Sequence, residues 1–121
     1  MSASFLVILF ILVNSDKTWS DAKDYCISRG ARLLEVRTQE QYNMAVRLRN
    51  ELGFHVWIGA TDIQSEGTWI WESDGQLVNL NLYWLSNRPG STNNYDCLAL
   101  SNIGFYDFLC SVPQRSVCEF P

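Results

Sequence analysis

The sequence has one histidine, three prolines and nine lysine or arginine residues among its 121 positions. The lone histidine, His55, excludes a multi-histidine zinc site and argues against a Ser/His/Asp catalytic triad. Thirteen acidic residues give a net charge of −4, and no basic stripe is present, which argues against nucleic acid as a partner. The hydrophobic fraction of 47% and the five tryptophans exclude a disordered chain, and the length suits one domain.

A run long enough to cross a membrane is also missing. The unbroken apolar run over residues 5–13 has nine residues, whereas a helix that spans a bilayer needs about 20. This run suits the apolar region of a secretory signal peptide with cleavage after Ser15, but it also suits a first strand of the domain. We therefore predict a signal peptide or a first strand over residues 1–15, a domain over residues 16–121, and a secreted, extracellular location.

The four cysteines agree with an oxidising compartment. In a short secreted chain, an even number of cysteines predicts a disulfide framework. Four cysteines allow three connectivities, and their number alone does not choose among them.

Two segments carry the signals of a helix start. Thr18 and Thr38 can each accept a backbone hydrogen bond, and each is followed three residues later by a polar residue that completes a capping box. We predict helices that begin at these residues and stop at Gly30 and Gly53. The residues expected on their buried faces are Trp19, Ala22, Cys26 and Ile27 in the first helix and Tyr42, Ala45, Val46, Leu48 and Leu52 in the second.

After Gly53 the pattern changes to short strands and long loops. Aromatic and branched residues predict strands over residues 54–59 and 68–71, and closing strands over 97–100 and 116–120. Residues 78–95 show little periodicity and many Asn, Ser, Pro and Gly residues, which predicts a long irregular loop. Such a loop inside a compact domain is usually functional.

Several residues recur in an order and spacing that are jointly specific. These are Trp19, Cys26, Gly30-Ala31-Arg32-Leu33, Trp57-Ile58-Gly59, Glu66-Gly67-Thr68-Trp69-Ile70-Trp71, Trp84, Cys97, Cys110 and Cys118-Glu119. From about residue 16 to residue 121 the chain resembles the C-type lectin-like domain. The resemblance implies an α+β fold in which two helices flank small antiparallel sheets, with a long irregular loop that carries the ligand site. It also implies the disulfides Cys26–Cys118 and Cys97–Cys110, and a first strand near residues 10–13 that pairs with the C-terminal strand.

The positions that hold calcium and sugar in that family have changed here. The family places carboxylate and amide side chains there, because Ca²⁺ takes about six to eight oxygen ligands. The corresponding residues here are Arg88-Pro89-Gly90, Tyr95 before Asp96, and Phe105-Tyr106-Asp107. Only Asp107 keeps a ligand type, and the guanidinium of Arg88 would repel a cation. We therefore expect the usual site to be absent; the alternative is a shifted set of Asn93, Asn94, Asp96 and Asp107.

Two further groups of acids resemble other calcium sites of the family. Asp62, Glu66 and Asp96 match an auxiliary site that would bind calcium weakly; the interpretation that we favour is that Asp62 and Glu66 end a strand and a turn on a solvated face. Glu119 matches a structural site in part, with Glu40 as its helix partner.

The aromatic residues divide into two groups. The resemblance places Trp57, Trp69 and Trp71 in the core, and we expect His55 to be a partly buried strand residue. The other aromatics surround the altered loop, where they either form a contact patch or replace metal coordination by packing. These residues are Tyr83, Tyr95, Phe105, Tyr106 and Phe108.

Together these features predict a secreted, non-enzymatic recognition module that binds a glycan or an extracellular protein through residues 78–96. It requires no cofactor and binds calcium weakly if at all; the alternative is a calcium-dependent lectin with non-standard ligands. No fixed pair of carboxylates supports a glycoside hydrolase. We expect no nucleic acid partner and no membrane span, and a homodimer through an exposed sheet edge is a further expectation. The candidate loop residues are Arg88, Asn93, Asn94, Tyr95, Asp96, Tyr106 and Asp107.

Overall fold

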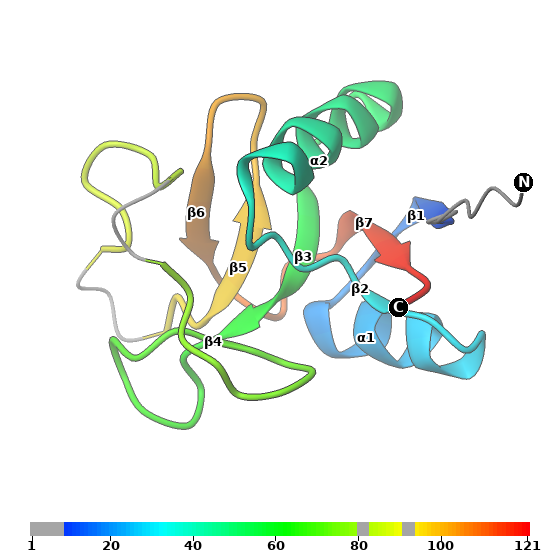
Figure 1. Cartoon of the computed structure of the whole chain (residues 1–121). Coiled ribbons are helices and arrows are strands. Elements are labelled where there is room, and N and C mark those ends of the chain that lie inside the picture. Colours follow the sequence, from blue (N-terminus) through cyan, green and yellow to red (C-terminus); the bar gives the residue numbers. More distant parts are fainter. Residues whose placement is uncertain (1–8, 80–82, 91–93) are drawn as a thin grey trace, which may run out of the picture.

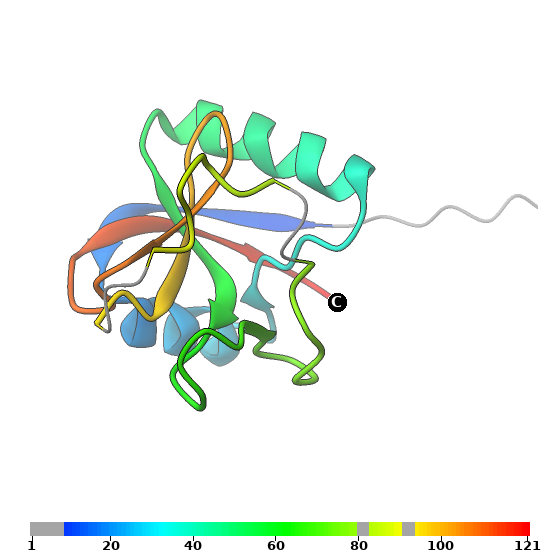
Figure 2. The same cartoon turned by 90° about the vertical axis from the view of Figure 1, so that its left-hand side faces the viewer.

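The computed structural model describes residues 9–79, 83–90 and 94–121. In chain order, its elements are β1 (Phe10–Lys17), α1 (Trp19–Ser28), β2 (Arg32–Leu33), α2 (Gln39–Leu52), β3 (Val56–Thr61), β4 (Ile70–Trp71), β5 (Cys97–Leu100), β6 (Phe105–Phe108) and β7 (Gln114–Glu119). Within these residues the strands form one seven-stranded sheet, and the two helices lie on opposite sides of its central strands (Figures 1 and 2). The α+β class predicted from the sequence is confirmed.

The sheet is built around β7. Its main strand order is β1-β7-β3-β5-β6, while β2 also pairs with β7 and β4 pairs with β3. Every pair is antiparallel except β3 with β7, so the predicted antiparallel sheets are joined into one mixed sheet. The expected first strand is present, because Phe10 lies opposite Glu119 and Val13 lies opposite Ser116. None of the helices among the described residues is long and apolar enough to cross a membrane.

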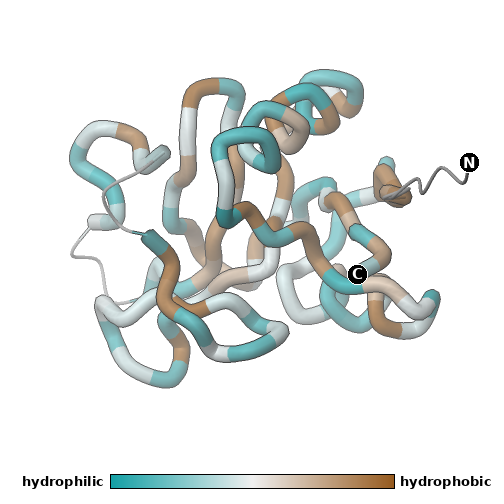
Figure 3. The backbone as a smooth tube through the Cα atoms, viewed as in Figure 1, coloured by the Kyte–Doolittle hydropathy of each residue, from teal (hydrophilic) through white to brown (hydrophobic). Residues whose placement is uncertain are grey.

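Both predicted helix starts are confirmed. The side chain of Thr18 accepts a hydrogen bond from the backbone N–H of Asp21 at 3.2 Å, and Thr38 accepts one from Gln41 at 3.1 Å. The predicted stop of α2 is also confirmed, because Gly53 follows the helix with φ 75°, a left-handed conformation that costs glycine little. In Figure 3, α2 alternates between hydrophilic and hydrophobic segments, as expected for a helix that covers a core with one face.

One helix expectation is wrong. Ile27 was placed on the buried face of α1, but 56% of it is exposed. Trp19, Ala22 and Cys26 are buried. These three residues follow one another at intervals of three and four, and residue 27 lies about 100° around the helix from residue 26, beyond the buried stripe.

The tryptophans expected in the core are there. Trp57, Trp69 and Trp71 are each at most 2% exposed. Two indoles also connect elements that are distant in sequence. Trp57 donates to the Lys17 carbonyl at 3.0 Å, and Trp19 donates to the Ile58 carbonyl at 2.8 Å. These bonds satisfy polar atoms that would be costly to bury unpaired.

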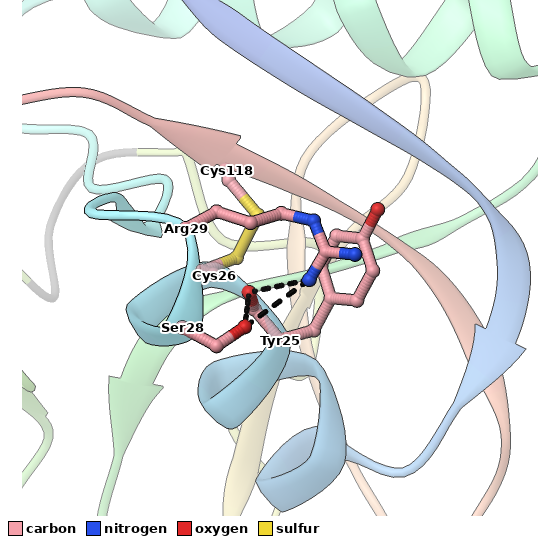
Figure 4. The surroundings of a disulfide bond; sticks show 5 residues. All are labelled: Tyr25, Cys26, Ser28, Arg29 and Cys118. Atoms are coloured by element: carbon pink, nitrogen blue, oxygen red, sulfur yellow. Dashed lines mark hydrogen bonds between the residues drawn. A yellow bond between two sulfur atoms is a disulfide. The ribbon is translucent and has the colours of Figure 1, made fainter.

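The two disulfides have the connectivity that the resemblance implied. Cys26 of α1 is bonded to Cys118 of β7, and Cys97 of β5 is bonded to Cys110. Beside the first bridge, the guanidinium of Arg29 lies 3.6 Å from the centre of the Tyr25 ring and donates to its carbonyl (Figure 4). The Cys26–Cys118 bridge holds α1 against β7, the strand around which the sheet is built.

The long loop between β4 and β5 is anchored where it passes β6. The N–H of Phe105 donates to the Tyr83 carbonyl at 2.6 Å, and the N–H of Leu85 donates to the Phe105 carbonyl at 2.8 Å. The loop runs so close that a Cβ atom on Gly104 would lie 2.5 Å from the Tyr83 carbonyl oxygen. This approach brings the following loop residues beside β6.

A chain that starts at Asp16 should be less stable than one that starts at residue 9. It would lack residues 10–15 of β1, including the buried side chain of Val13 (3% exposed). Burying a valine contributes about 1.5 kcal/mol or more, so the melting temperature should fall by about 5 °C or more. The uncovered edge of β7 should also promote association. Calorimetry and size-exclusion chromatography of the two chains measure both effects. Equal stability with both chains monomeric would contradict this prediction.

Candidate functional site

One arginine joins the long loop to β6. Arg88 Nη1 lies 2.8 Å from Oδ1 of Asp107 and 2.5 Å from the backbone oxygen of the same residue. The N–H of Gly90 donates to the other carboxylate oxygen, Oδ2, at 3.0 Å. The Asp107 side chain is 1% exposed and that of Arg88 is 32% exposed. Both carboxylate oxygens of Asp107 therefore bind the loop itself.

The ion pair with Arg88 compensates the negative charge of the buried Asp107 carboxylate, and this compensation requires no metal ion. A buried carboxylate is costly unless charge and hydrogen-bond donors compensate it. Arg88 supplies the compensating positive charge, and Gly90 supplies a further hydrogen-bond donor. A metal ion at Asp107 would meet the positive guanidinium at close range and would have to displace it.

Three aromatic rings lie beside the ion pair. Tyr95 and Phe108 have ring centres 5.5 Å apart, and Tyr106 and Phe108 have ring centres 5.9 Å apart. The Arg88 guanidinium lies 5.8 Å from the ring centres of both tyrosines. Such distances allow cation–π attraction between Arg88 and the two tyrosines.

Tyr106 also connects this group to residues beyond the loop. Its hydroxyl donates to Gln114 Oε1 at 3.0 Å and lies 3.0 Å from Nδ1 of His55. Burial raises the pKa of Tyr106 to about 12. The phenol is therefore neutral at physiological pH and remains able to donate.

Two of the five candidate aromatics face the protein interior instead. Phe105 is 1% exposed and belongs to the core. Tyr83 stacks on Tyr42 of α2, with ring centres 4.1 Å apart, and its hydroxyl donates to Gln39. For these two rings packing explains the residue type, whereas Tyr95, Tyr106 and Phe108 remain beside the loop.

The three predicted auxiliary acids lie together. Carboxylate oxygens of Asp62, Glu66 and Asp96 are all within 4.8 Å of one another. Asp62 is buried, Asp96 is half-buried and Glu66 is exposed. Burial raises the pKa of Asp62 and also that of Asp96. The Gly67 N–H donates to one oxygen of Asp62, at 2.9 Å.

The same acids contain buried oxygens with unused hydrogen-bonding capacity. Oδ1 of Asp62 and Oδ1 of Asp96 are buried without a hydrogen-bond partner. Three carboxylates at this spacing offer oxygen ligands of the kind that Ca²⁺ prefers. The arrangement is therefore chemically suited to a hard cation, with the remaining ligands left to backbone or water.

A second arginine–carboxylate ion pair joins Arg32 to Glu119. Glu119 is the residue that the sequence analysis compared with a structural calcium site. Arg32 Nε lies 2.9 Å from Oε2 of Glu119, and the N–H of Glu35 donates to the same oxygen at 3.1 Å. Glu40 is exposed in the first turn of α2. The contacts of Glu119 thus give no support to the expected partnership with Glu40.

The structure divides the candidate loop residues among three places. Arg88, Tyr95, Tyr106 and Asp107 come together, while Asp96 joins the acidic group. Asn94 is exposed in a turn. Asn93, which the sequence analysis also named, lies outside the described residues.

Three features were missed or misplaced by the sequence analysis. His55 is exposed and directly precedes β3, so its expected place as a partly buried strand residue is wrong. The pairing of Arg88 with Asp107 was also missed. The sequence contains a signal for it, because among the positions compared with calcium ligands one holds a positively charged residue and one keeps an acid. The role of Gln114 had no sequence signal, because its contact to Tyr106 depends on how β6 and β7 approach each other.

Comparison with known proteins gives the family. The model of the C-type lectin domain matches residues 15–120. The chain therefore belongs to the C-type lectin domain family, which makes it a lectin-like recognition module. Relatives include C-type lectin domain family 4 member M of Nomascus concolor, which is 28% identical over 113 residues. That match covers 93% of this chain but only 28% of the relative's length.

Solved structures agree with this assignment. The carbohydrate-recognition domain of the mouse scavenger receptor C-type lectin has a TM-score of 0.84 at 24% identity, covering 97% of this chain and 91% of that one. Human lithostathine has a TM-score of 0.83 at 28% identity, covering 98% and 86%. The fold is thus that of the C-type lectin domain.

Replacing Arg88 by methionine should destabilise the protein, because Asp107 would keep its buried charge without its cationic partner. Breaking a buried ion pair costs about 3–5 kcal/mol, and the part-exposed guanidinium places this pair at the lower end. We expect the melting temperature to fall by about 10 °C. The matched control is Arg47→Met, at an exposed position on α2. Equal melting temperatures for the two variants would show that the ion pair contributes nothing.

Proposed function

We propose that this domain is a secreted, non-enzymatic recognition module that binds a glycan or an extracellular protein without a calcium bridge. Its binding surface is the part of the long loop around Arg88 and Tyr95, together with the adjoining face of β6. The observation that carries this proposal is the ion pair between Arg88 and Asp107. In a calcium-bridged sugar site the ion must keep coordination positions open for hydroxyl groups, and a guanidinium has none.

The side chains around the ion pair are suited to direct recognition. Arg88 is partly exposed and Tyr95 is half-buried, so both retain accessible surface, and Asn94 is exposed next to them. A tyrosine offers a flat apolar face together with a hydroxyl group, and an asparagine side chain both donates and accepts hydrogen bonds. This combination suits a sugar ring or a polar protein surface.

The remaining chemistry supports a binding role in an extracellular setting. All four cysteines are in disulfides, which persist in oxidising compartments and remove every free thiol. The single histidine is hydrogen-bonded to Tyr106. Cleavage after Ser15 stays a proposal, and N-terminal sequencing of secreted protein decides it.

A glycan array read in calcium and again in chelator tests the proposed binding mode. We expect the same ligands to be retained in both conditions. Tyr95→Ala should weaken their binding by about tenfold, and Tyr25→Ala, which removes a half-buried tyrosine of α1, should leave it unchanged. Binding that disappears in chelator would contradict the proposal, and a blank array would restrict the ligand to proteins.

The acidic group of Asp62, Glu66 and Asp96 favours a second candidate function, weak calcium binding away from Asp107. Like charges within 4.8 Å repel one another, and a divalent cation would relieve that repulsion. This site would stabilise the fold without bridging a ligand. The calcium-dependent lectin remains the alternative if that cation also reaches a sugar.

Chelation should lower the melting temperature by less than about 5 °C, which corresponds to roughly 1 kcal/mol in a domain of this size. Asp96→Asn should raise the melting temperature in chelator, because it removes one of three neighbouring charges. The same variant should abolish any stabilisation by added calcium, while Asp24→Asn, at an exposed position of α1, should not. Thermal melts with and without calcium measure these effects. A larger chelator effect in the wild type would refute weak binding.

We also propose a second copy of the chain as a partner. Strand β1 pairs with β7, so the proposed cleavage after Ser15 would remove residues 10–15 of β1 and leave that edge of β7 without its neighbour. An unpaired edge is a template for pairing with another chain. Sedimentation at several concentrations tests this dimer, and a monomer at every concentration would exclude it.

A further inference from the structure

A separate cavity lies outside the long loop. Its volume is about 510 Å³, and its wall comes from the end of α2, the residues before β3, and the start of β7. Among the residues that the structure describes, none from the loop over 78–96 and none from the acidic group lines this cavity. The volume is typical of small-molecule sites, which measure about 300–1,000 Å³.

The charged groups of this cavity leave one positive charge without a partner. Arg115 forms an ion pair with Asp16, and its guanidinium lies 4.3 Å from the centre of the Phe54 ring. Arg49, by contrast, makes no ion pair with the described part of the chain. Its Nη1 donates to the neutral side chain of Asn50 at 3.1 Å. Partial removal of water from its ring, and then the charge of Arg49, lower the pKa of His55 in the same wall.

Two donors in the cavity wall also lack acceptors. Nε of Arg49 and Nε2 of Gln114 are buried without a hydrogen-bond partner among the described residues. Tyr106 holds the other end of the Gln114 amide through Oε1. A buried donor without an acceptor is costly, so both side chains favour an acceptor in this cavity. A single anionic acceptor there would satisfy both the charge and the donors.

We propose that this cavity binds a small organic monocarboxylate, which Arg49 holds with help from Gln114. A planar carboxylate matches the fork of a guanidinium with two parallel hydrogen bonds, and its one charge balances the one unpaired arginine. Phe54, which is 52% exposed, and Pro113 give the rest of the ligand an apolar wall. This site is independent of the function proposed for the long loop.

His55 lines the cavity and is the only histidine, so its ring protons report on the site without assignment of other residues. The experiment follows these signals by NMR in the full chain, in chelator, at about pH 7.5, where a histidine is neutral. Acetate and glucuronate are the probes, glucose is the neutral partner of glucuronate, and sodium chloride controls for ionic strength. Arg49→Met is compared with Arg47→Met, which removes an exposed charge from the same helix.

We expect both carboxylates to shift the His55 signals with saturation at roughly millimolar concentration, and glucose and chloride to leave them unchanged. Arg49→Met should weaken the binding by about tenfold or more, and Arg47→Met should preserve it. In the Arg49→Met protein, the pKa of His55 should also rise, which confirms a folded cavity that lacks this charge. No response to either carboxylate, an equal response to glucose or to chloride, or unchanged binding in Arg49→Met would each overturn the proposal.

Discussion

The disulfide between Cys26 and Cys118 is the constraint on which the rest of the fold depends, because it fixes β7. That strand pairs with β1, β2 and β3, and its cysteine holds α1 against the sheet. The bridge joins residues 92 positions apart and contributes about 4–5 kcal/mol in the chain-entropy model. Small domains have a total stability of about 5–15 kcal/mol, so this one bond is a large share. The loop site lies on β6, at the far end of the strand order, where it can vary without disturbing this centre.

Two arginine–carboxylate pairs in this chain share one arrangement. Arg88 pairs with Asp107 and Arg32 pairs with Glu119, and in each case a backbone N–H completes the carboxylate's hydrogen bonds. A guanidinium is covalently attached, so its charge does not depend on ion concentration. It donates along fixed directions and accepts nothing, so it holds the loop closed but leaves no coordination positions for a ligand. The recognition that we propose for this surface depends on side-chain hydrogen bonds and stacking.

Tyr106 lies between the loop surface and the separate cavity. Its ring faces Arg88 and Phe108, while its hydroxyl contacts His55 and Gln114 in the cavity wall. A ligand on either side would therefore contact groups that touch the same tyrosine. The hydroxyl remains protonated because burial raises its pKa, which keeps this connection a chain of neutral hydrogen bonds.

Local sequence signals determined the helices and much of the sheet. The capping threonines, the glycine stop of α2 and the strand over residues 97–100 depend on neighbouring residues, and the family spacing implied the disulfides. The sequence also determined which residue types surround the long loop between β4 and β5. Only the tertiary structure decided their partners, because the pairing of Arg88 with Asp107 joins the long loop to a separate strand, β6. The same holds for Ile27, His55 and Gln114, because exposure and long-range contacts depend on how separate elements approach, which no local pattern encodes.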